Sequence, residues 1–520
     1  MTAQGRDLSD LGAASRGPQV EQHGIDPIPE SERTSRPGEF GWIWSSAQFC
    51  FGTVVLGALP VSYGLGWWAA CTAILVGVAV GTLMVLPLVR FGLRTGLNDP
   101  MASGAHFGVR GRVLGNVITI AVAIGFFAIS VWTGGTAVMV AAHQIIGTPV
   151  GRGPLALAMP AAAVAVVLVA ALGHNALVRT YKATAVLGGL VLLFLVAVLA
   201  PGFEPGYGGG DLALGSTGAT WLLAATASAA APLSYATFQG DYSRYMSGRR
   251  GDRPVLLWAG TSMFLTCVAA LLVGAYVTTF FPTDPLWLQG LTDAVPGWSV
   301  PVIVVFGLVG TLPQGGLCLY AAGLSVNSLF WRTSRATATL AVAVPSILAL
   351  YLGAVVYDAM DSMSAFVSLL LTAVAPWAAV LTVGYLFHRG RYHPAELAPD
   401  GAPAGRYWYT GGLNPRAVAA FVTGGVLGVL WVNNPLYVGP LAELTAGVDL
   451  SLPVSFGAAA LVHTALCLLW PEPDGPVGAA GTVGAAGPRP AAGEVLSPAA
   501  PPPARQEPEP TPGAGPGRPR

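Results

Sequence analysis

Long apolar runs alternate with short polar connections over most of the chain. Twelve of these runs are each about 20 residues long, which suffices for a helix to cross about 30 Å of hydrocarbon. Lipid offers no hydrogen-bond partners to a bare backbone, so each run is predicted to be helical. The expected spans are 40–61, 66–89, 113–142, 154–172, 183–200, 218–239, 254–280, 300–328, 337–357, 364–387, 415–432 and 452–470. The pattern predicts an all-α polytopic membrane protein with twelve transmembrane helices.

The two ends of the chain lack this pattern. Residues 1–38 are polar and contain several prolines, and residues 471–520 hold 14 of the chain's 42 prolines among Ala and Gly. Neither segment has the apolar periodicity that a packed core requires. We therefore expect a disordered tail at each end and a single helical domain over residues 39–470.

Composition separates this chain from soluble enzymes. Only 10% of the 520 residues are charged, against about 25% in soluble proteins, and the mean hydropathy is +0.62. Acidic and basic residues balance at 25 each, so no net charge points to nucleic acid. The five cysteines lie in apolar runs without a CxxC pair. Neither a metal site nor a cofactor is expected.

The basic residues give the orientation. If the amino terminus is cytoplasmic, 24 of the 25 Lys and Arg residues fall in cytoplasmic segments, and Arg152 is the exception. Positive charges concentrate in this way only when the number and direction of the helices are both assigned correctly. The sequence thus predicts a multi-pass protein of the cell (inner) membrane with both termini in the cytoplasm.

Polar residues and helix-breaking residues coincide in two of the spans. The first span carries Ser46 and Gln48 at membrane depth, followed by Gly52 and Gly57. The sixth span contains Pro232 and Gly240, and proline removes a backbone hydrogen bond from a helix. Interrupted helices at matching positions of two halves indicate an inverted-repeat transporter with its site at the breaks. Because the spans carry almost no ionisable side chains, the expected substrate is small and uncharged.

Other functions find less support in the sequence. There is no GxxxxGK[ST] phosphate-binding loop and no Ser–His–Asp, HExxH or paired-carboxylate constellation within the spans, so neither ATP-driven transport nor an enzyme is predicted. Two alternatives stay open. One is an uncoupled uniporter, and the other is a sensor that keeps the fold without transporting. Gly77 and Gly81, in GxxxG spacing, are expected to mark close helix packing.

Several motifs resemble those of one transporter family. Asp241-Tyr242-Ser243-Arg244-Tyr245 is similar to the DYSRY signature of the nucleobase–cation symporter family, the purine, cytosine and allantoin permeases. Four further segments resemble the corresponding segments of this family: Phe40–Gln48, Arg94–Gly111, Ala375 to Tyr392, and the YWYTGGLN loop at Tyr407–Asn414. The resemblance extends over about residues 38–432.

The resemblance implies a fold and a function. The fold is a five-plus-five inverted repeat of the leucine-transporter type, with repeat one at 40–200, repeat two at 218–387 and two extra helices at 415–470. The function is secondary active import of a nucleobase or related heterocycle, such as cytosine, a purine, allantoin or a hydantoin. Import would proceed by alternating access coupled to Na⁺ or H⁺. The partners implied are this neutral heterocycle and the lipid bilayer, with no nucleic acid and no required oligomer.

The family's substrate positions fall on specific residues of this chain. An aromatic ring on the third helix and a polar group four residues later align with Phe126 and Ser130, and a second aromatic ring on the sixth helix aligns with Tyr235. The remaining candidates are Gln48 on the first helix and Gln314 and Cys318 on the eighth.

The family's cation positions are less well matched. They fall on Ser46, Phe49 and Thr311, while Leu312 and Pro313 replace the hydroxyl pair of sodium-dependent relatives. Na⁺ prefers oxygen ligands, so sodium coupling is the less favoured alternative. Asp241 and Arg244 are expected to form a structural ion pair at the cytoplasmic gate.

Overall fold

The computed structural model describes residues 25–171, 174–282, 287–330, 333, 335–397, 405–445 and 447–471. Most of the two predicted tails, residues 1–24 and 472–520, lies outside the described residues. The main helices are α1 (Glu39–Gln48), α2 (Phe51–Leu56), α3 (Leu59–Ser62), α4 (Trp67–Val85), α5 (Val89–Thr95), α8 (Val113–Ile146), α9 (Arg152–Ala171), α10 (His174–Leu199), α11 (Thr217–Leu233), α12 (Gln239–Ser243), α13 (Arg253–Thr278), α15 (Val300–Leu329), α16 (Arg335–Tyr351), α17 (Ala359–His388), α18 (Pro415–Leu430) and α19 (Ser451–Leu469).

Every predicted span coincides with one of these helices or with a pair of them. Among the described residues, eight helices are long and apolar enough to cross a membrane, and a bent pair brings the number to nine. Parts of α9 and the whole of α18 are apolar but shorter. Leucines on outward faces are largely exposed, as at Leu157 (83%) and Leu461 (74%), which is the surface that lipid covers.

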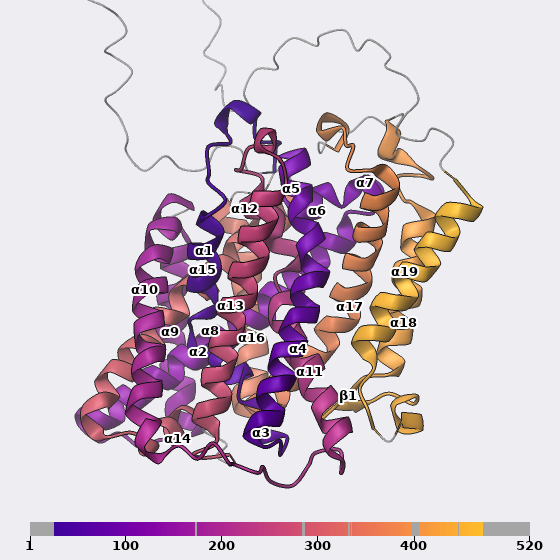
Figure 1. Cartoon of the computed structure of the whole chain (residues 1–520). Helices are drawn as coiled ribbons and strands as arrows, with labels where there is room; N and C mark the ends of the chain where they lie inside the picture. Colours follow the sequence, from indigo (N-terminus) through magenta and orange to yellow (C-terminus); the bar gives the residue numbers. More distant parts are fainter. Residues whose placement is uncertain are drawn as a thin grey trace, which may run out of the picture. The chain divides into compact units, whose positions relative to one another are not determined.

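The helix contacts repeat between the two halves. The first span packs on α13 and α10, just as the sixth span packs on α4 and α17. Likewise α8 packs on α9 as α15 packs on α16, and α8 and α15 pack extensively on each other at the centre. This pairing is that of a five-plus-five inverted repeat. The remaining helices, α18 and α19, pack on each other and on α17 (Figure 1).

The predicted GxxxG packing is confirmed between α4 and α11. A Cβ atom added at Gly77 would lie 2.1 Å from the carbonyl oxygen of Ala225, and one at Gly81 would lie 2.4 Å from that of Ala229. Only glycine lets two helix backbones come this close. The contact fixes α11, the first half of the sixth span, against the opposite repeat.

Both predicted helix breaks are present. The first span bends by 65° between α1 and the α2–α3 segment, where Phe49 and Cys50 leave helical geometry. The sixth span ends its first half at Leu233, passes through a 3₁₀ turn at η5 (Ala236–Phe238), and resumes as α12. The first break lies at residues 49–50 rather than at Gly52, which is inside α2. Gly52 serves another purpose, described below.

The loops carry structure that the apolar pattern did not predict. Short helices α6 (Asp99–Ala102) and α7 (Gly104–Phe107) follow α5, α14 (Trp287–Ala294) precedes α15, and the strands β1 (Asn433–Asn434) and β2 (Tyr437–Val438) join α18 to α19. Helix α5, α6, α7 and α12 lie at one end of the helices, which we call the Arg-rich end, and α3, α14 and β1 lie at the other (Figure 1). Arg90, Arg94, Arg112 and Arg253 belong to the first end.

Two boundary predictions need correction. Residues 25–38, expected to be part of a disordered tail, are held in place. Ile28 is buried, the Arg33 guanidinium donates to the carbonyl of Leu93, and Ser35 pairs with Met246. Helix α10 begins at His174, nine residues before the predicted span, so Lys182 lies within a helix rather than in a loop.

Candidate functional site

The break in the first span faces the middle of α15. The Cys50 thiol at the break donates a hydrogen bond to Gln314 Oε1. A Cβ atom added at Gly52 would lie 2.9 Å from the same oxygen and 3.2 Å from Ile129 of α8. Gly52 therefore leaves room for the Gln314 amide beside the break, and α2, α8 and α15 converge at this point.

Tyr235 occupies the break in the sixth span, and its ring meets the first span. The Trp44 and Tyr235 rings are in edge contact, with centroids 5.1 Å apart. The structure thus places Tyr235, which the family alignment had nominated, beside Trp44 of the first span.

Trp44 and Gln48 lie one turn apart on the same face of α1. Both side chains are buried, and the Gln48 amide nitrogen contacts the Met263 sulfur at 3.8 Å. Within the described part of the chain, neither Trp44 Nε1 nor Gln48 Oε1 has a hydrogen-bond partner. A buried polar atom without a partner is costly. These two atoms therefore supply an unused donor and an unused acceptor near the break.

Phe126 and Ser130 lie on α8 as predicted, and their side chains make different contacts. The Phe126 ring is 5.4 Å from the Phe366 ring of α17 in edge contact. The Ser130 hydroxyl donates to the Phe126 carbonyl at 2.8 Å, so its proton is engaged within its own helix. An apolar cavity of about 350 Å³ opens between α8, α16 and α17 and is lined by Phe366, Gly125 and Ile129, among others.

At two of the three predicted cation positions, Ser46 and Thr311, the side-chain hydroxyl is bonded within its own helix. The Ser46 hydroxyl donates to Ile43 within α1. The Thr311 hydroxyl donates to Gly307, and a Cβ atom added at Gly134 of α8 would lie 2.8 Å from it. The residue of α15 beside the Phe49–Cys50 break is instead Gly310, which has no side-chain ligand. Thr311 faces α8 rather than the first span, since successive residues of a helix point about 100° apart.

Asp241 and Arg244 are buried at the Arg-rich end, at 2% and 0% exposure. The Arg244 guanidinium donates to the hydroxyls of Tyr245 and Tyr320. An ion pair between Asp241 and Arg244 stays a prediction. The Asp241 charge acts on Asp99, from the loop before α8, a residue that the sequence analysis did not nominate.

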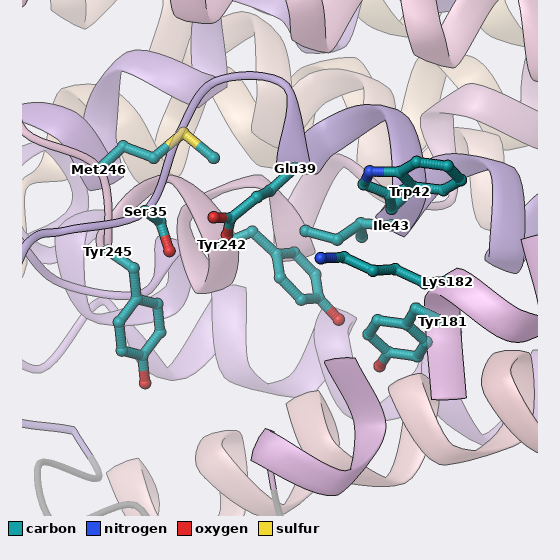
Figure 2. Close-up of a pocket in the computed structure, with 9 residues that line it drawn as sticks. All are labelled: Ser35, Glu39, Trp42, Ile43, Tyr181, Lys182, Tyr242, Tyr245 and Met246. Carbon is teal, nitrogen blue, oxygen red and sulfur yellow. The ribbon is translucent and has the colours of Figure 1, made fainter. Parts of the chain in front are cut away.

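The Arg-rich end of the site is closed by aromatic side chains. A cavity of about 20 Å³ lies where the start of α1, α10 and α12 meet, and Figure 2 shows the side chains that line it. This volume holds about one water molecule. The Tyr242 side chain is hydrogen-bonded to Tyr181, and its ring is in edge contact with Trp44. The lining residues are Ser35, Glu39, Trp42, Ile43, Tyr181, Lys182, Tyr242, Tyr245 and Met246.

Sequence reasoning missed Trp44, Cys50, Met263 and Asp99. Trp44 and Asp99 stand inside two of the motifs already recognised, Phe40–Gln48 and Arg94–Gly111, so those motifs were the available signal. Cys50 and Met263 are ordinary apolar-run residues in the sequence. Cys50 lies near the site because the first span breaks there, and Met263 lies near it because α13 packs against that span.

Comparison with known proteins identifies the family. Residues 27–455 match the family model described as "Permease for cytosine/purines, uracil, thiamine, allantoin". A Bacillus subtilis (strain 168) protein provisionally named as a purine-cytosine permease, YxlA, is 24% identical over 462 residues, covering 86% of this chain and 96% of the relative.

Two solved structures share the fold. One is Mhp1, a nucleobase-cation-symport-1 family transporter, in a closed conformation with bromovinylhydantoin bound. It has a TM-score of 0.67 at 19% identity and covers 87% of this chain and 97% of Mhp1. Mhp1 in an inward-facing conformation has a TM-score of 0.68 at 16% identity and covers 86% and 94%. The family match extends over most of the chain, and the chain therefore belongs to the family of permeases for cytosine, purines, uracil, thiamine and allantoin, which are membrane transporters and not enzymes.

Proposed function

We propose that this protein is a secondary active transporter that imports a nucleobase or a related small heterocycle, such as cytosine, a purine, allantoin or a hydantoin. The observation that carries the proposal is the meeting of two broken helices, with the ring of Trp44 in the first span in edge contact with that of Tyr235 in the sixth. Breaks of this kind free backbone groups and make room for a ligand at mid-membrane. The substrate would lie there, between Tyr235 and Phe126.

The chemistry of the site supports an uncharged planar substrate. Its nominated residues are aromatic rings, amides, a hydroxyl and thiols, and a charged ligand would need a compensating charge at this depth. Trp44 Nε1 and Gln48 Oε1 offer a donor and an acceptor on one face of α1. This pair suits a heterocycle that presents a carbonyl group beside a ring N–H.

Alternating access is supported by the closed Arg-rich end. Trp44, Tyr181 and Tyr242 block the route between α1, α10 and α12, and this end would open to the cytoplasm if both termini are cytoplasmic, as the charge pattern predicts. We further propose that the coupling cation is H⁺. The hydroxyl of Thr311 is directed toward α8, and Leu312 and Pro313 provide no side-chain oxygen ligand.

Uptake by the purified protein in liposomes tests this function. We expect saturable uptake of at least one compound from a panel of cytosine, uracil, hypoxanthine, allantoin and hydantoin, with mutual competition among those that bind. A gradient of H⁺, and not one of Na⁺, should drive accumulation above equilibrium. Equilibration without accumulation under either gradient would identify a uniporter, and no uptake of any compound would contradict the proposal.

A further inference from the structure

Beneath the break in the sixth span lies a buried carboxyl group that the substrate site does not use. Asp99 begins α6, in the connection between the second and third spans, and is 1% exposed. Its Oδ2 accepts a hydrogen bond from the backbone N–H of Gly240 at 2.6 Å. Asp99 therefore holds the start of α12, the inner half of the broken helix.

The second oxygen of this carboxyl group, Oδ1, is buried and lies among other buried polar atoms that lack hydrogen bonds in the described part of the chain. Among the described residues, Asp99 Oδ1 has no hydrogen-bond partner, and the same is true of both amide atoms of the neighbouring Asn98 and of the Gln239 amide nitrogen. A Cβ atom added at Gly240 would lie 2.7 Å from Asp99 Oδ1. Because Gly240 has no side chain, the Asp99 carboxyl group can lie against the backbone at the start of α12. A buried carboxylate oxygen in this state is expensive unless a proton neutralises it.

We infer that Asp99 is the proton-binding group of the transport cycle, and that Oδ1 takes up the proton that travels with the substrate. A hydronium ion that enters from the exterior with the substrate gives up one O–H bond as a new O–H bond forms at Oδ1, which leaves water and a neutral carboxyl in the closed conformation. When the Arg-rich end opens, water reaches the carboxyl, the O–H bond breaks, and the proton leaves to the cytoplasm. This inference rests on the proposed function and adds the coupling site to it.

The surroundings of Asp99 favour this order of events. Burial, the largest effect, raises the pKa of the Asp99 carboxyl well above its usual value. The hydrogen bond from the Gly240 N–H opposes this rise, and the charge of Asp241 adds to it. The closed conformation therefore prefers the protonated form, and its preference strengthens as the pH falls. Hydration on opening would return the pKa toward about 4, so the proton would dissociate near neutral pH.

Several other titratable or charged groups lie on the described elements that pack against α6. They are Asp241, Tyr242 and Arg244 at α12, Arg90 and Arg94 of α5, Cys318 and Tyr320 of α15, His106 of α7, Arg112 before α8, His143 of α8, and Glu396 of η9 (Pro394–Leu397). Arg90 and Arg94 are paired with Asp252, and the Arg112 guanidinium donates to the carbonyl of Leu397. Asp241 is the neighbour whose charge opposes ionisation of Asp99.

The test compares the wild type with Asp99→Asn, in which the side-chain oxygen still accepts from α12 but the group no longer titrates. The full-length proteins are placed in liposomes, and the probe is whichever radiolabelled compound among cytosine, uracil, hypoxanthine and allantoin the wild type exchanges fastest. Counterflow, which needs no net proton movement, should persist in Asp99→Asn within about threefold. With an acidic exterior, the ratio of substrate concentration inside the liposomes to that outside should reach up to about tenfold per pH unit in the wild type. In the variant this ratio should fall to about one.

Asp252→Asn is the matched control. It removes a carboxylate that also lies at the Arg-rich end but pairs with Arg94, so transport in this variant should stay coupled to the proton gradient. If Asp99→Asn does not fold, Asp99→Ser serves in its place, as it also offers an acceptor without titrating. Proton-driven accumulation retained by the Asp99 variant would overturn the inference, as would wild-type accumulation driven by Na⁺ alone. A wild type without counterflow would contradict the proposed function itself, and the inference with it.

Discussion

Phe126→Ala should raise the apparent KM for the transported heterocycle by about five- to 150-fold while substrate-saturated transport falls much less. Stacking of a base on an aromatic ring contributes about 1–3 kcal/mol, and each 1.4 kcal/mol is about tenfold in affinity. Phe126 is buried on α8 with its ring in edge contact with that of Phe366, and the proposed function places the substrate beside the Phe126 ring. The measurement is the concentration dependence of initial uptake into proteoliposomes.

Phe127→Ala is the control for this variant. Phe127 is also buried, but it points about 100° away around the same helix, so its truncation costs packing energy without removing a stacking face. Both variants should lose thermal stability to a similar degree, because removing a buried ring costs about 3–5 kcal/mol. An unchanged KM for Phe126→Ala, or an equal rise for Phe127→Ala, would remove Phe126 from the substrate site.

Gln314→Leu should reduce kcat/KM by about five- to 150-fold. The substitution keeps the volume of the side chain but removes the oxygen that accepts from Cys50 beside the Gly52 backbone. A buried polar group that loses its partner costs about 1–3 kcal/mol, and here the lost group is at the point where α2, α8 and α15 meet. Initial uptake rates at several substrate concentrations, normalised to protein in the liposome, provide the measurement.

Thr311→Val provides the comparison on the same helix. The Thr311 hydroxyl is bonded within α15 and lies against Gly134 of α8, so transport should stay within about twofold of the wild type and should not gain or lose dependence on Na⁺. A large loss in Thr311→Val with little change in Gln314→Leu would mean that the roles assigned to these two positions are reversed.

The fold was largely predictable because hydrophobic thickness and backbone hydrogen bonding leave few choices. Apolar runs gave the helices, and Pro232 indicated the break in the sixth span. The first break was displaced by a few residues, since Gly52 is needed for the approach of Gln314 rather than for bending. Residues 25–38 were misassigned because a short polar segment gives no sign of the backbone pairing that holds it, as between Ser35 and Met246.

The site was predictable only where the family motifs carried the position. Tyr235 lies beside Trp44 of the first span, whereas Thr311, which was placed by alignment, packs against Gly134 of α8. Asp99 was not nominated although it lies in the Arg94–Gly111 motif, because a polar residue in a loop normally faces water. Its burial depends on α6 folding in under α12 and on the missing side chain of Gly240.

An experimental structure with the transported heterocycle bound would test the central claim most directly. The account predicts ligand density at mid-membrane beside the Phe49–Cys50 break, with one face of the ring toward Phe126, the other toward Tyr235, and polar edges within hydrogen-bond distance of Gln48 or Gln314. Density elsewhere, for example in the apolar cavity between α8, α16 and α17 with the region around Tyr235 packed shut, would contradict it.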